Sequence, residues 1–232
     1  KASGLDVMVY IHGGYYSNGF IGSDGYGDLL VAKDVIVVML QYRLGLLGFL
    51  STGDKKIPGN FGLRDQNLAL QWVKSNIEHF GGDPSKITLF GQSAGAVSVH
   101  MHILSPYSKD LFSRAILQSG NAIQPFATRN DHSNVALRVG NDLQCTGVTK
   151  ESTAGDVDLF PCLQSANATE LVTLYNDYQT LEVVPLLFVP RVDGDFLPAA
   201  PEVLLRQGNF NRVDIISGIT RDEGALVTKR LY

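Results

Sequence analysis

Short apolar runs alternate along this chain with longer amphipathic stretches, and this alternation is typical of a sheet flanked by helices. The apolar runs are rich in Val, Ile and Leu, as expected for parallel strands that are buried on both faces. The sequence therefore predicts an α/β fold. We expect strands at residues 6–11, 35–42, 87–90, 115–118 and 213–217.

The clearest helical pattern runs from about Arg64 to His79 and ends at the Gly-Gly-Asp-Pro stretch 81–84. Its apolar residues recur at spacings of three and four positions, so we expect one stripe that faces the sheet. Further helices are predicted at 94–104 and near 201–207. The stripe consists of Ala69, Leu70, Val73, Ile77 and Phe80.

Between residues 120 and 184 the pattern loosens into weaker helical stretches with many Asn, Asp, Thr and Ser residues. We interpret this segment as a helical and looped excursion within one domain that covers residues 1–232, rather than as a second domain. Regular order resumes with an apolar segment at 184–190 and a turn at 193–195.

The composition is that of one soluble globular domain, because 44% of the 232 residues are hydrophobic and 18% are charged. The 19 Lys and Arg residues stand against 23 Asp and Glu residues, which leaves no basic footprint for nucleic acid or an anionic membrane. The longest apolar runs, at 35–40 and 44–50, are much shorter than the roughly 20 residues of a membrane span. We therefore expect neither a nucleic-acid partner nor a membrane span.

Two cysteines, Cys145 and Cys162, enclose a polar, loop-like stretch of the excursion. A disulfide between them would constrain the unfolded chain by about 3 kcal/mol and would indicate an oxidising compartment. The triplet Asn167-Ala168-Thr169 is an acceptor sequence for N-glycosylation and points the same way. We therefore expect a secreted protein or one of the secretory pathway.

The strongest chemical signal is the pentapeptide Gly-Gln-Ser-Ala-Gly at 91–95, between a predicted strand and a predicted helix. This placement is typical of a nucleophile elbow, a sharp turn that holds a serine in strained backbone geometry and exposes its hydroxyl. Glycine is needed on both sides because a side chain at Gly91 or Gly95 would collide with neighbouring elements. Ser93 is therefore the candidate nucleophile.

A second glycine-rich turn, His12-Gly13-Gly14, follows the first predicted strand. Together with the elbow it predicts an oxyanion hole, in which backbone N–H groups stabilise negative charge on a substrate oxygen. The donors would be amides of Gly13, Gly14 or residue 15, and the amide of Ala94 at the start of the helix. An ordinary glycine turn after a strand is the other interpretation.

Further motifs extend this pattern: GNFGLRDQ at 59–66, ALQWV at 69–73, FGGDP at 80–84 and GITRDEG at 218–224. With the elbow, they resemble the cholinesterase-like, or type-B, carboxylesterase and lipase family, and the resemblance covers essentially the whole chain. Bile-salt-activated lipases, liver-type carboxylesterases and juvenile hormone esterases are similar. The resemblance implies an α/β-hydrolase fold and hydrolysis of a small-molecule carboxylic ester through a serine acyl-enzyme, without cofactor or metal.

The resemblance also implies roles for single residues. Ser93 would be the nucleophile and Glu223 the acid of a serine–acid–histidine triad. Ser119 and Gln92 would support these groups without contacting the substrate. An acyl pocket would be lined by Val184, Leu186 and Leu187, which are otherwise ordinary core residues.

Two positions depart from the family pattern. Tyr15 stands where the family has a third small residue after His-Gly-Gly, or one glycine is deleted and the tyrosine aligns one position later. Gln92 stands where cholinesterases have a Glu, which disfavours a quaternary ammonium substrate. A neutral xenobiotic, lipid or hormone ester is therefore expected.

The base is the missing part, because the family's histidine lies far beyond the acid and this sequence ends at Tyr232. We expect the five histidines present to have structural or surface roles, and the chain to be inactive alone. The expected fold is an incomplete α/β-hydrolase that lacks its first strands and C-terminal part, so its exposed sheet edge predicts aggregation. A non-catalytic adhesion or binding module, and a truncated product without function, are the alternatives.

Overall fold

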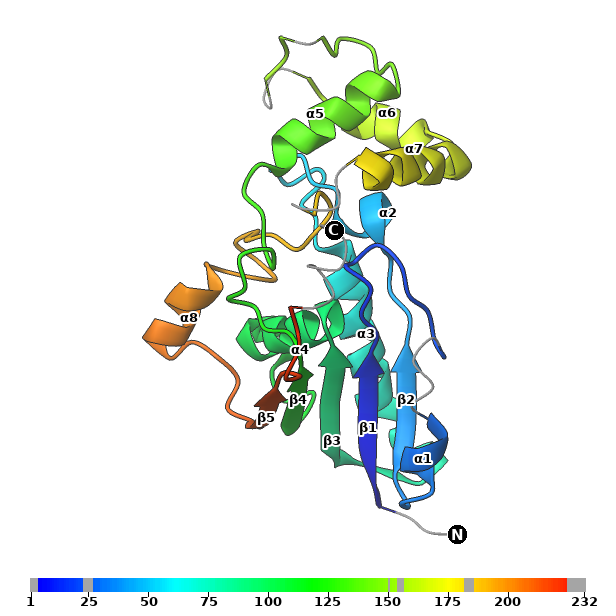
Figure 1. Cartoon of the computed structure of the whole chain (residues 1–232), viewed down its shortest axis with the longest axis vertical. Helices are drawn as coiled ribbons and strands as arrows, with labels where there is room; N and C mark the ends of the chain where they lie inside the picture. The colour runs from blue at the N-terminus through cyan, green and yellow to red at the C-terminus, as the bar shows by residue number, and fades with distance from the viewer. Residues whose placement is uncertain (1–3, 23–26, 150, 154–156, 182–185, 225–232) are drawn as a thin grey trace.

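The computed structural model describes residues 4–22, 27–149, 151–153, 157–181 and 186–224. Five parallel strands form one sheet, flanked by helices, in the order β2-β1-β3-β4-β5 (Figure 1). This arrangement confirms the predicted α/β class. The strands are β1 (Leu5–Ile11), β2 (Ile36–Leu40), β3 (Gly82–Gln92), β4 (Arg114–Gln118) and β5 (Asp214–Gly218).

Strand β3 begins at Gly82, earlier than the sequence predicts. The two glycines and the proline at 81–84 predict the end of the preceding helix, and the strand is expected only from residue 87. In the structure Gly82 pairs with Leu5, and the register of β1 and β3 then shifts before Val7. An irregular ladder of this kind tolerates the proline at the strand's start, where a regular pattern of apolar residues is absent.

The helices connect these strands in chain order. Helix α4 keeps its predicted bounds and α8 lies at the predicted residues, whereas α3 begins earlier, directly after its N-cap residue Asn60, which has φ 57°. The helices are α1 (Gly27–Val31), α2 (Gly45–Phe49), α3 (Phe61–Asn76), α4 (Ala94–Leu104), α5 (His132–Asp142), α6 (Phe160–Ser165), α7 (Ala168–Leu181) and α8 (Pro201–Gln207), with short 3₁₀ turns η1 (Ile77–Phe80) and η2 (Pro106–Ser108).

The apolar stripe of α3 is largely as predicted. Leu70, Val73 and Ile77 are buried, and Ala69 is half-buried. Phe80 was wrongly placed in the stripe: it is 63% exposed and its ring lies 6.0 Å from that of Trp72. The helical spacing ends before Phe80 because the last turn tightens into η1.

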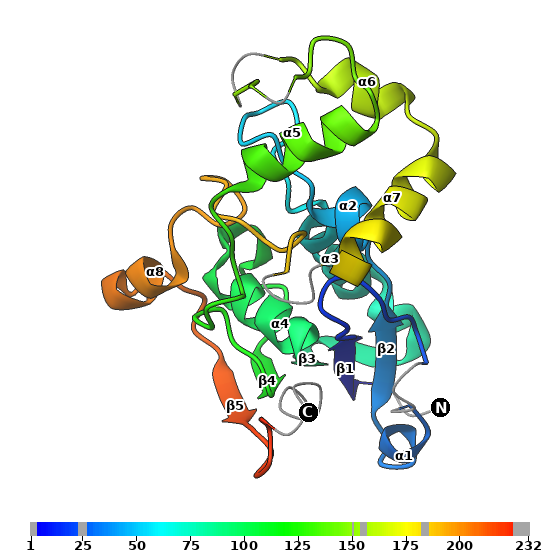
Figure 2. The same ribbon diagram turned by 45° about the horizontal axis from the view of Figure 1, so that its top comes forward.

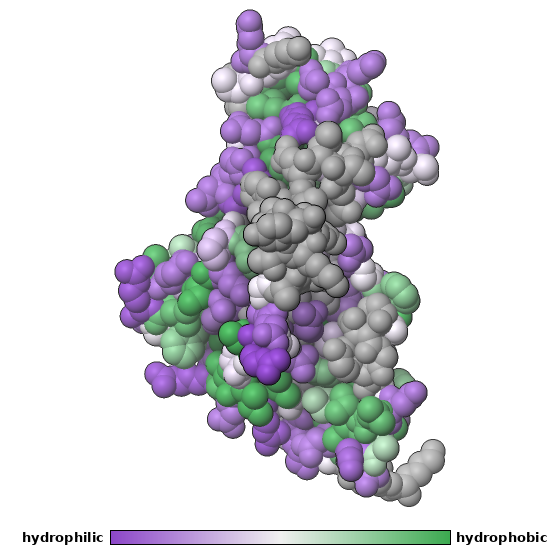
Figure 3. All heavy atoms as spheres, viewed as in Figure 1, coloured by the Kyte–Doolittle hydropathy of each residue, from purple (hydrophilic) through white to green (hydrophobic). Residues whose placement is uncertain are grey.

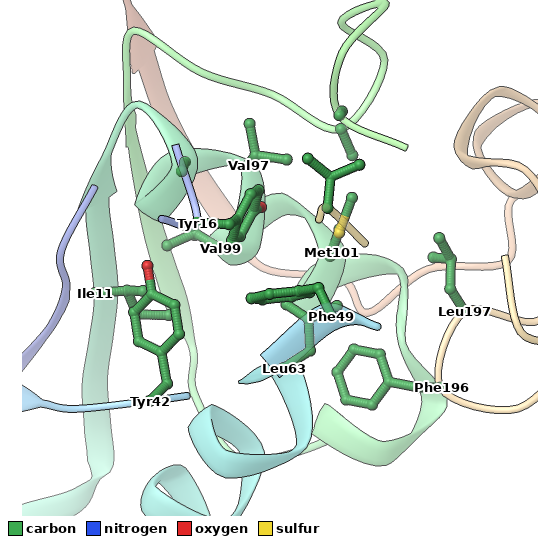
Figure 4. Packing of buried hydrophobic residues seen from close by; sticks show 14 of the residues in the cluster. Ile11, Tyr16, Tyr42, Phe49, Leu63, Val97, Val99, Met101, Phe196 and Leu197 are labelled. Carbon is green, nitrogen blue, oxygen red and sulfur yellow. The ribbon is translucent and has the colours of Figure 1, made fainter. Parts of the chain in front are cut away.

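The core lies between the sheet and its helices. Helix α4 packs against β1, β3 and β4, and α3 packs against β3. Figure 4 shows side chains of this cluster, including Ile11 from β1, Leu63 from α3, and Val97 and Val99 from α4. Burial of α4 is almost complete, which positions its first residue rigidly at the end of β3.

The excursion predicted between residues 120 and 184 contains α5, α6 and α7, which gather beyond the carboxyl ends of the strands (Figures 1 and 2). The predicted disulfide Cys145–Cys162 is present, with 5.8 Å between the two Cα atoms. Helix α7 contacts α2, where the ring of Tyr175 lies against Gly45. The description of the chain as a single domain stays a prediction.

The sheet has an exposed edge at β5, whose five residues are all exposed. Ile215 and Ile216 are 51% and 68% exposed, and Figure 3 shows hydrophobic surface over β5 and near α1. The exposed edge agrees with the expectation from sequence, whereas aggregation of the isolated chain stays a prediction. Among the described helices, none has the length and apolar character needed to cross a bilayer.

Candidate active site

The candidate nucleophile, acid and oxyanion groups lie at one edge of the sheet. Gly13 follows β1, Ser93 follows β3, Ser119 follows β4 and Glu223 lies shortly after β5. Because the strands are parallel, their carboxyl ends meet at the same edge, where open α/β sheets place their ligands. The topology therefore gathers residues that are far apart in the sequence.

Ser93 occupies a sharp turn between β3 and α4. Its φ of 55° and ψ of −122° lie outside the regions that non-glycine residues normally adopt. The Ser93 amide donates to the carbonyl oxygen of Gln118 at 2.8 Å, and the Ser93 carbonyl accepts from the Val97 amide at 2.9 Å. These backbone bonds tie the strained residue to the end of β4 and to the first turn of α4.

The flanking glycines are required by space. A Cβ atom on Gly95 would lie 2.1 Å from the carbonyl oxygen of Ile11, and one on Gly91 would lie 2.6 Å from the carbonyl carbon of Gly95. Both contacts are with backbone atoms, which cannot rotate away. The steric reason expected from the sequence is therefore present in the structure.

The glycine-rich turn after β1 lies directly against the elbow. A Cβ atom on Gly13 would lie 3.3 Å from the Cβ of Ser93 and 2.9 Å from Oε1 of Gln92. Within the described residues, the Gly13 and Gly14 amides donate to no backbone acceptor. Ala94, the first residue of α4, has no acceptor within its helix. Three amides are thus available on two segments that border Ser93.

Two tyrosines follow this turn, both with left-handed backbone angles. Tyr15 has φ 57° and is 39% exposed, whereas Tyr16 has φ 60° and is 2% exposed. Such angles cost about 1–2 kcal/mol per non-glycine residue. The side chain of Tyr16 is buried in the core, whereas that of Tyr15 lies at the surface next to the glycine turn.

His12 holds the glycine turn and is not placed as a base. Its Nδ1 bonds the carbonyl oxygen of Gly13 at 2.8 Å, and its ring stacks on Tyr42 with centroids 4.5 Å apart. The Tyr42 hydroxyl donates to the carbonyl oxygen of His12 at 2.8 Å. The imidazole is buried, and its Nε2 has no partner among the described residues.

Glu223 is exposed, and its carboxylate accepts three hydrogen bonds. Its Oε2 accepts from the Thr220 amide at 2.9 Å, from the Thr220 hydroxyl at 2.8 Å and from the Ser119 hydroxyl at 3.0 Å. The two Thr220 bonds, followed by that of Ser119, lower the pKa of the Glu223 carboxyl. Thr220 was missed by the sequence analysis, although Thr-x-x-Glu is the pattern of a capping box.

Ser119 joins the acid to the end of β4. It has φ 55°, and its amide donates to the carbonyl oxygen of Gly218 at 2.9 Å. A Cβ atom on the adjacent Gly120 would lie 2.3 Å from the carbonyl oxygen of Ser93. The segment that supports Glu223 is therefore the one that packs beneath the candidate nucleophile.

The other histidines have structural or surface positions, as expected. His79 is exposed, and Nδ1 of His100 accepts from the Ala122 amide at 3.1 Å. His102 lies between Gln66 and Ser108 in the core, where burial lowers its pKa to about 3. Burial, followed by the charge of Arg191, lowers the pKa of His132 to about 4. Within the described residues, none of the five hydrogen-bonds to Ser93 or Glu223.

The proposed acyl pocket is only partly placed. Leu186 and Leu187 are half-buried and pack against the core, whereas Val184 lies outside the described residues. Arg129 donates from Nη1 to the carbonyl oxygen of Leu186 at 2.9 Å. The pocket role of these residues stays a prediction.

Asn167 is exposed at the start of α7, and its Oδ1 accepts from the Thr169 amide at 2.8 Å. This bond supplies an acceptor to the helix N-terminus. An exposed acceptor asparagine agrees with the predicted glycosylation site, which stays a prediction.

The parallel sheet flanked by helices and the sharp strand-to-helix turn at Ser93 define an α/β-hydrolase fold. A model of the family described as the Carboxylesterase family matches residues 1–232. The chain belongs to this family.

Three curated relatives have nearly the same sequence identity to this chain. Acetylcholinesterase of Danio rerio is 41% identical over 97% of the chain and 36% of its own length. Cholinesterase 1 of Branchiostoma lanceolatum is 42% identical over 96% of the chain and 63% of its own length. Pyrethroid hydrolase Ces2e of Rattus norvegicus is 40% identical over 100% of the chain and 39% of its own length. The chain thus spans less than two thirds of the length of these relatives.

Proposed function

We propose that this chain carries the nucleophile, the acid and the oxyanion donors of a carboxylic ester hydrolase that works through a serine acyl-enzyme. The observation that carries the proposal is the contact between the strained Ser93 turn and Gly13. A Cβ atom added to Gly13 would lie 3.3 Å from the Cβ of Ser93. A purely structural turn has no need of a strained serine beside amides that donate to no backbone acceptor in the described part of the chain.

In the proposed reaction, the Ser93 hydroxyl attacks the ester carbonyl carbon. The carbonyl oxygen becomes an oxyanion, which accepts hydrogen bonds from the amides of the Gly13–Gly14 turn and of Ala94. The N-terminal end of α4 adds a positive partial charge at the same place. The alcohol leaves with a proton, and water then hydrolyses the acyl-enzyme to release the acid and restore Ser93.

A base must remove the Ser93 proton, and Glu223 is suited to orient it. The lowered pKa of Glu223 keeps this carboxylate charged, so that it can hold an imidazole in one tautomer and stabilise the imidazolium. Because no histidine of the described residues contacts Ser93 or Glu223 through a hydrogen bond, we propose that the base lies outside these 232 residues. The 232-residue chain alone then hydrolyses esters only very slowly.

We propose a neutral small-molecule ester as substrate. Gln92, directly before the nucleophile, is uncharged, and its Oε1 lies against the Gly13 turn. The site therefore offers no carboxylate at this position for a cationic group. The disulfide supports a further proposal, that the protein is secreted or belongs to the secretory pathway.

Labelling with a fluorophosphonate, which reacts with activated serines, tests the proposal. The probe is applied to the 232-residue chain and to the product of its full natural reading frame. We expect strong labelling of the full product, little of the 232-residue chain, none of Ser93→Ala and unchanged labelling of Ser113→Ala, which replaces an exposed serine. If the folded full product does not label, the hydrolase proposal is wrong and a non-catalytic binding module takes its place.

A further inference from the structure

A chain of buried hydrogen bonds runs from α3 through α4 to Tyr16. Gln71 Nε2 donates to Asn67 Oδ1 at 2.7 Å, and Asn67 Nδ2 donates to Ser108 Oγ at 3.0 Å. Ser108 Oγ then bonds Nδ1 of His102 at 2.7 Å. Apart from Gln71, these side chains are buried, which makes each missing bond costly.

The chain continues on the other side of the imidazole. His102 Nε2 bonds Gln66 Oε1 at 3.0 Å, Gln66 Nε2 donates to Ser98 Oγ at 3.3 Å, and Ser98 Oγ donates to the Tyr16 hydroxyl at 3.3 Å. Gln66, Ser98 and His102 are completely buried. No step of the proposed reaction uses these groups directly.

The direction of every bond is fixed by the chemistry of the partners. The amide oxygen of Gln66 can only accept, so Nε2 of His102 carries the proton. Burial keeps His102 neutral, and its Nδ1 therefore accepts from the Ser108 hydroxyl. All donors then point the same way, toward Tyr16, an arrangement in which neighbouring hydrogen bonds strengthen one another.

Tyr16 ends this series of hydrogen bonds and lies within the turn that follows the proposed oxyanion donors, where the Ser17 and Asn18 amides both donate to the Gly14 carbonyl oxygen. Three successive residues of that turn, Gly14, Tyr15 and Tyr16, have positive φ angles of 110°, 57° and 60°. The ring of Tyr16 packs against Phe49, and both belong to the buried cluster that also contains Val97 and Val99 of α4 (Figure 4). Its carbonyl oxygen accepts from the Gly45 amide at 2.7 Å. A strained turn persists only where the surrounding structure holds it, and the buried contacts of Tyr16 hold this one.

We propose that Tyr16, held by Ser98, Gln66 and His102, is a positioning residue that fixes the oxyanion amides of Gly13 and Gly14 against Ser93. This inference rests on the proposed ester hydrolysis. This series of hydrogen bonds affects the transition state, because the positioned amides bind the oxyanion more strongly than they bind the carbonyl oxygen of the neutral ester.

The test uses Ser98→Ala and Tyr16→Phe in the full-length natural protein. Each removes a single hydroxyl and leaves the packing of the core almost unchanged. The matched control is Ser105→Ala, which deletes a buried hydroxyl that accepts from the Tyr107 amide and has no bond to Tyr16. The measurements are kcat and KM for a neutral p-nitrophenyl ester, the affinity for a trifluoromethyl ketone that forms an oxyanion on the serine, and the melting temperature.

We expect kcat and ketone affinity to fall about tenfold in both variants, with KM changed less than twofold, because displaced donors weaken only transition-state binding. The control keeps the kcat and ketone affinity of the unmodified protein. The variants could instead melt at a lower temperature while kcat per titrated active site and ketone affinity stay unchanged. That result would show a purely structural role and overturn this inference, but not the proposed function. If the unmodified protein neither hydrolyses the ester nor binds the ketone, the proposed function is wrong and this inference falls with it.

Discussion

Gly95→Ala is the change whose effect the structure determines most directly. The added Cβ would lie 2.1 Å from the carbonyl oxygen of Ile11 and 2.9 Å from that of His12. An ordinary carbon–oxygen contact is 3.4 Å or longer, so α4 and the end of β1 must separate by roughly 1 Å. Overpacking of this kind costs about 1–3 kcal/mol of stability. A misplacement of roughly 1 Å between nucleophile and oxyanion donors costs about 10²-fold in rate.

The assay measures the melting temperature and the ester hydrolysis rate of the full-length natural protein with this substitution. Gly27→Ala is the matched control, because its Cβ would meet only the flexible end of Met39 at 3.4 Å. We expect Gly95→Ala to melt lower and to lose about 10²-fold in kcat, while the control keeps both values. Full activity and stability of Gly95→Ala would refute the view that close approach of β1 to α4 positions Ser93.

Four further predictions address other parts of the molecule. Glu223→Gln keeps the shape of the acid but removes its charge, and we expect kcat of the full-length protein to fall about 10⁴-fold with an unchanged melting temperature; a loss below tenfold would contradict the role. Cys162→Ser opens a loop of sequence separation 17 and should lower the free energy of unfolding, measured in urea, by about 3 kcal/mol. Asn167→Gln should abolish the mobility shift that a glycosidase produces in protein from a secreting eukaryotic host, and an unchanged shift would exclude this site. His102 and His132 have lowered pKa values of about 3 and 4, so their contribution to stability is complete above pH 6.5 and declines as the pH falls toward these values. Melting scans between pH 7.5 and 5 should show this decline, and His132→Asn should reduce its slope.

The fold could be predicted where a pattern is local. The strands that follow a regular apolar pattern, such as β1 and β4, were found to within one residue. The start of β3 was missed because Gly82 pairs with Leu5 through an irregular register that no local pattern encodes. Phe80 was misplaced for a similar reason, since the helical period predicts burial only while the helix continues, and the chain tightens into η1 before this residue.

The site could be predicted where glycine is required because backbone atoms of neighbouring segments leave no room for a side chain. Gly91 and Gly95 mark the approach of β1, and the residues around Ser93 therefore follow from the sequence. The chain from His102 to Tyr16 could not be predicted, because it joins three segments through side chains whose types are ordinary in cores and surfaces alike. Thr220 lies between these cases, since its spacing from Glu223 is a recognisable local pattern.

The two proposed triad members differ in how firmly the fold holds them. Ser93 lies between the buried strand β3 and the almost fully buried helix α4, and its amide bonds the end of β4. Glu223 follows β5, whose residues are all exposed and whose only partner strand among the described residues is β4. The Ser119 amide continues the β4–β5 ladder by one bond and, through its hydroxyl, also holds the Glu223 carboxylate. A segment that covers β5 should therefore raise activity by fixing Glu223 relative to Ser93, while the geometry of the nucleophile itself stays unchanged.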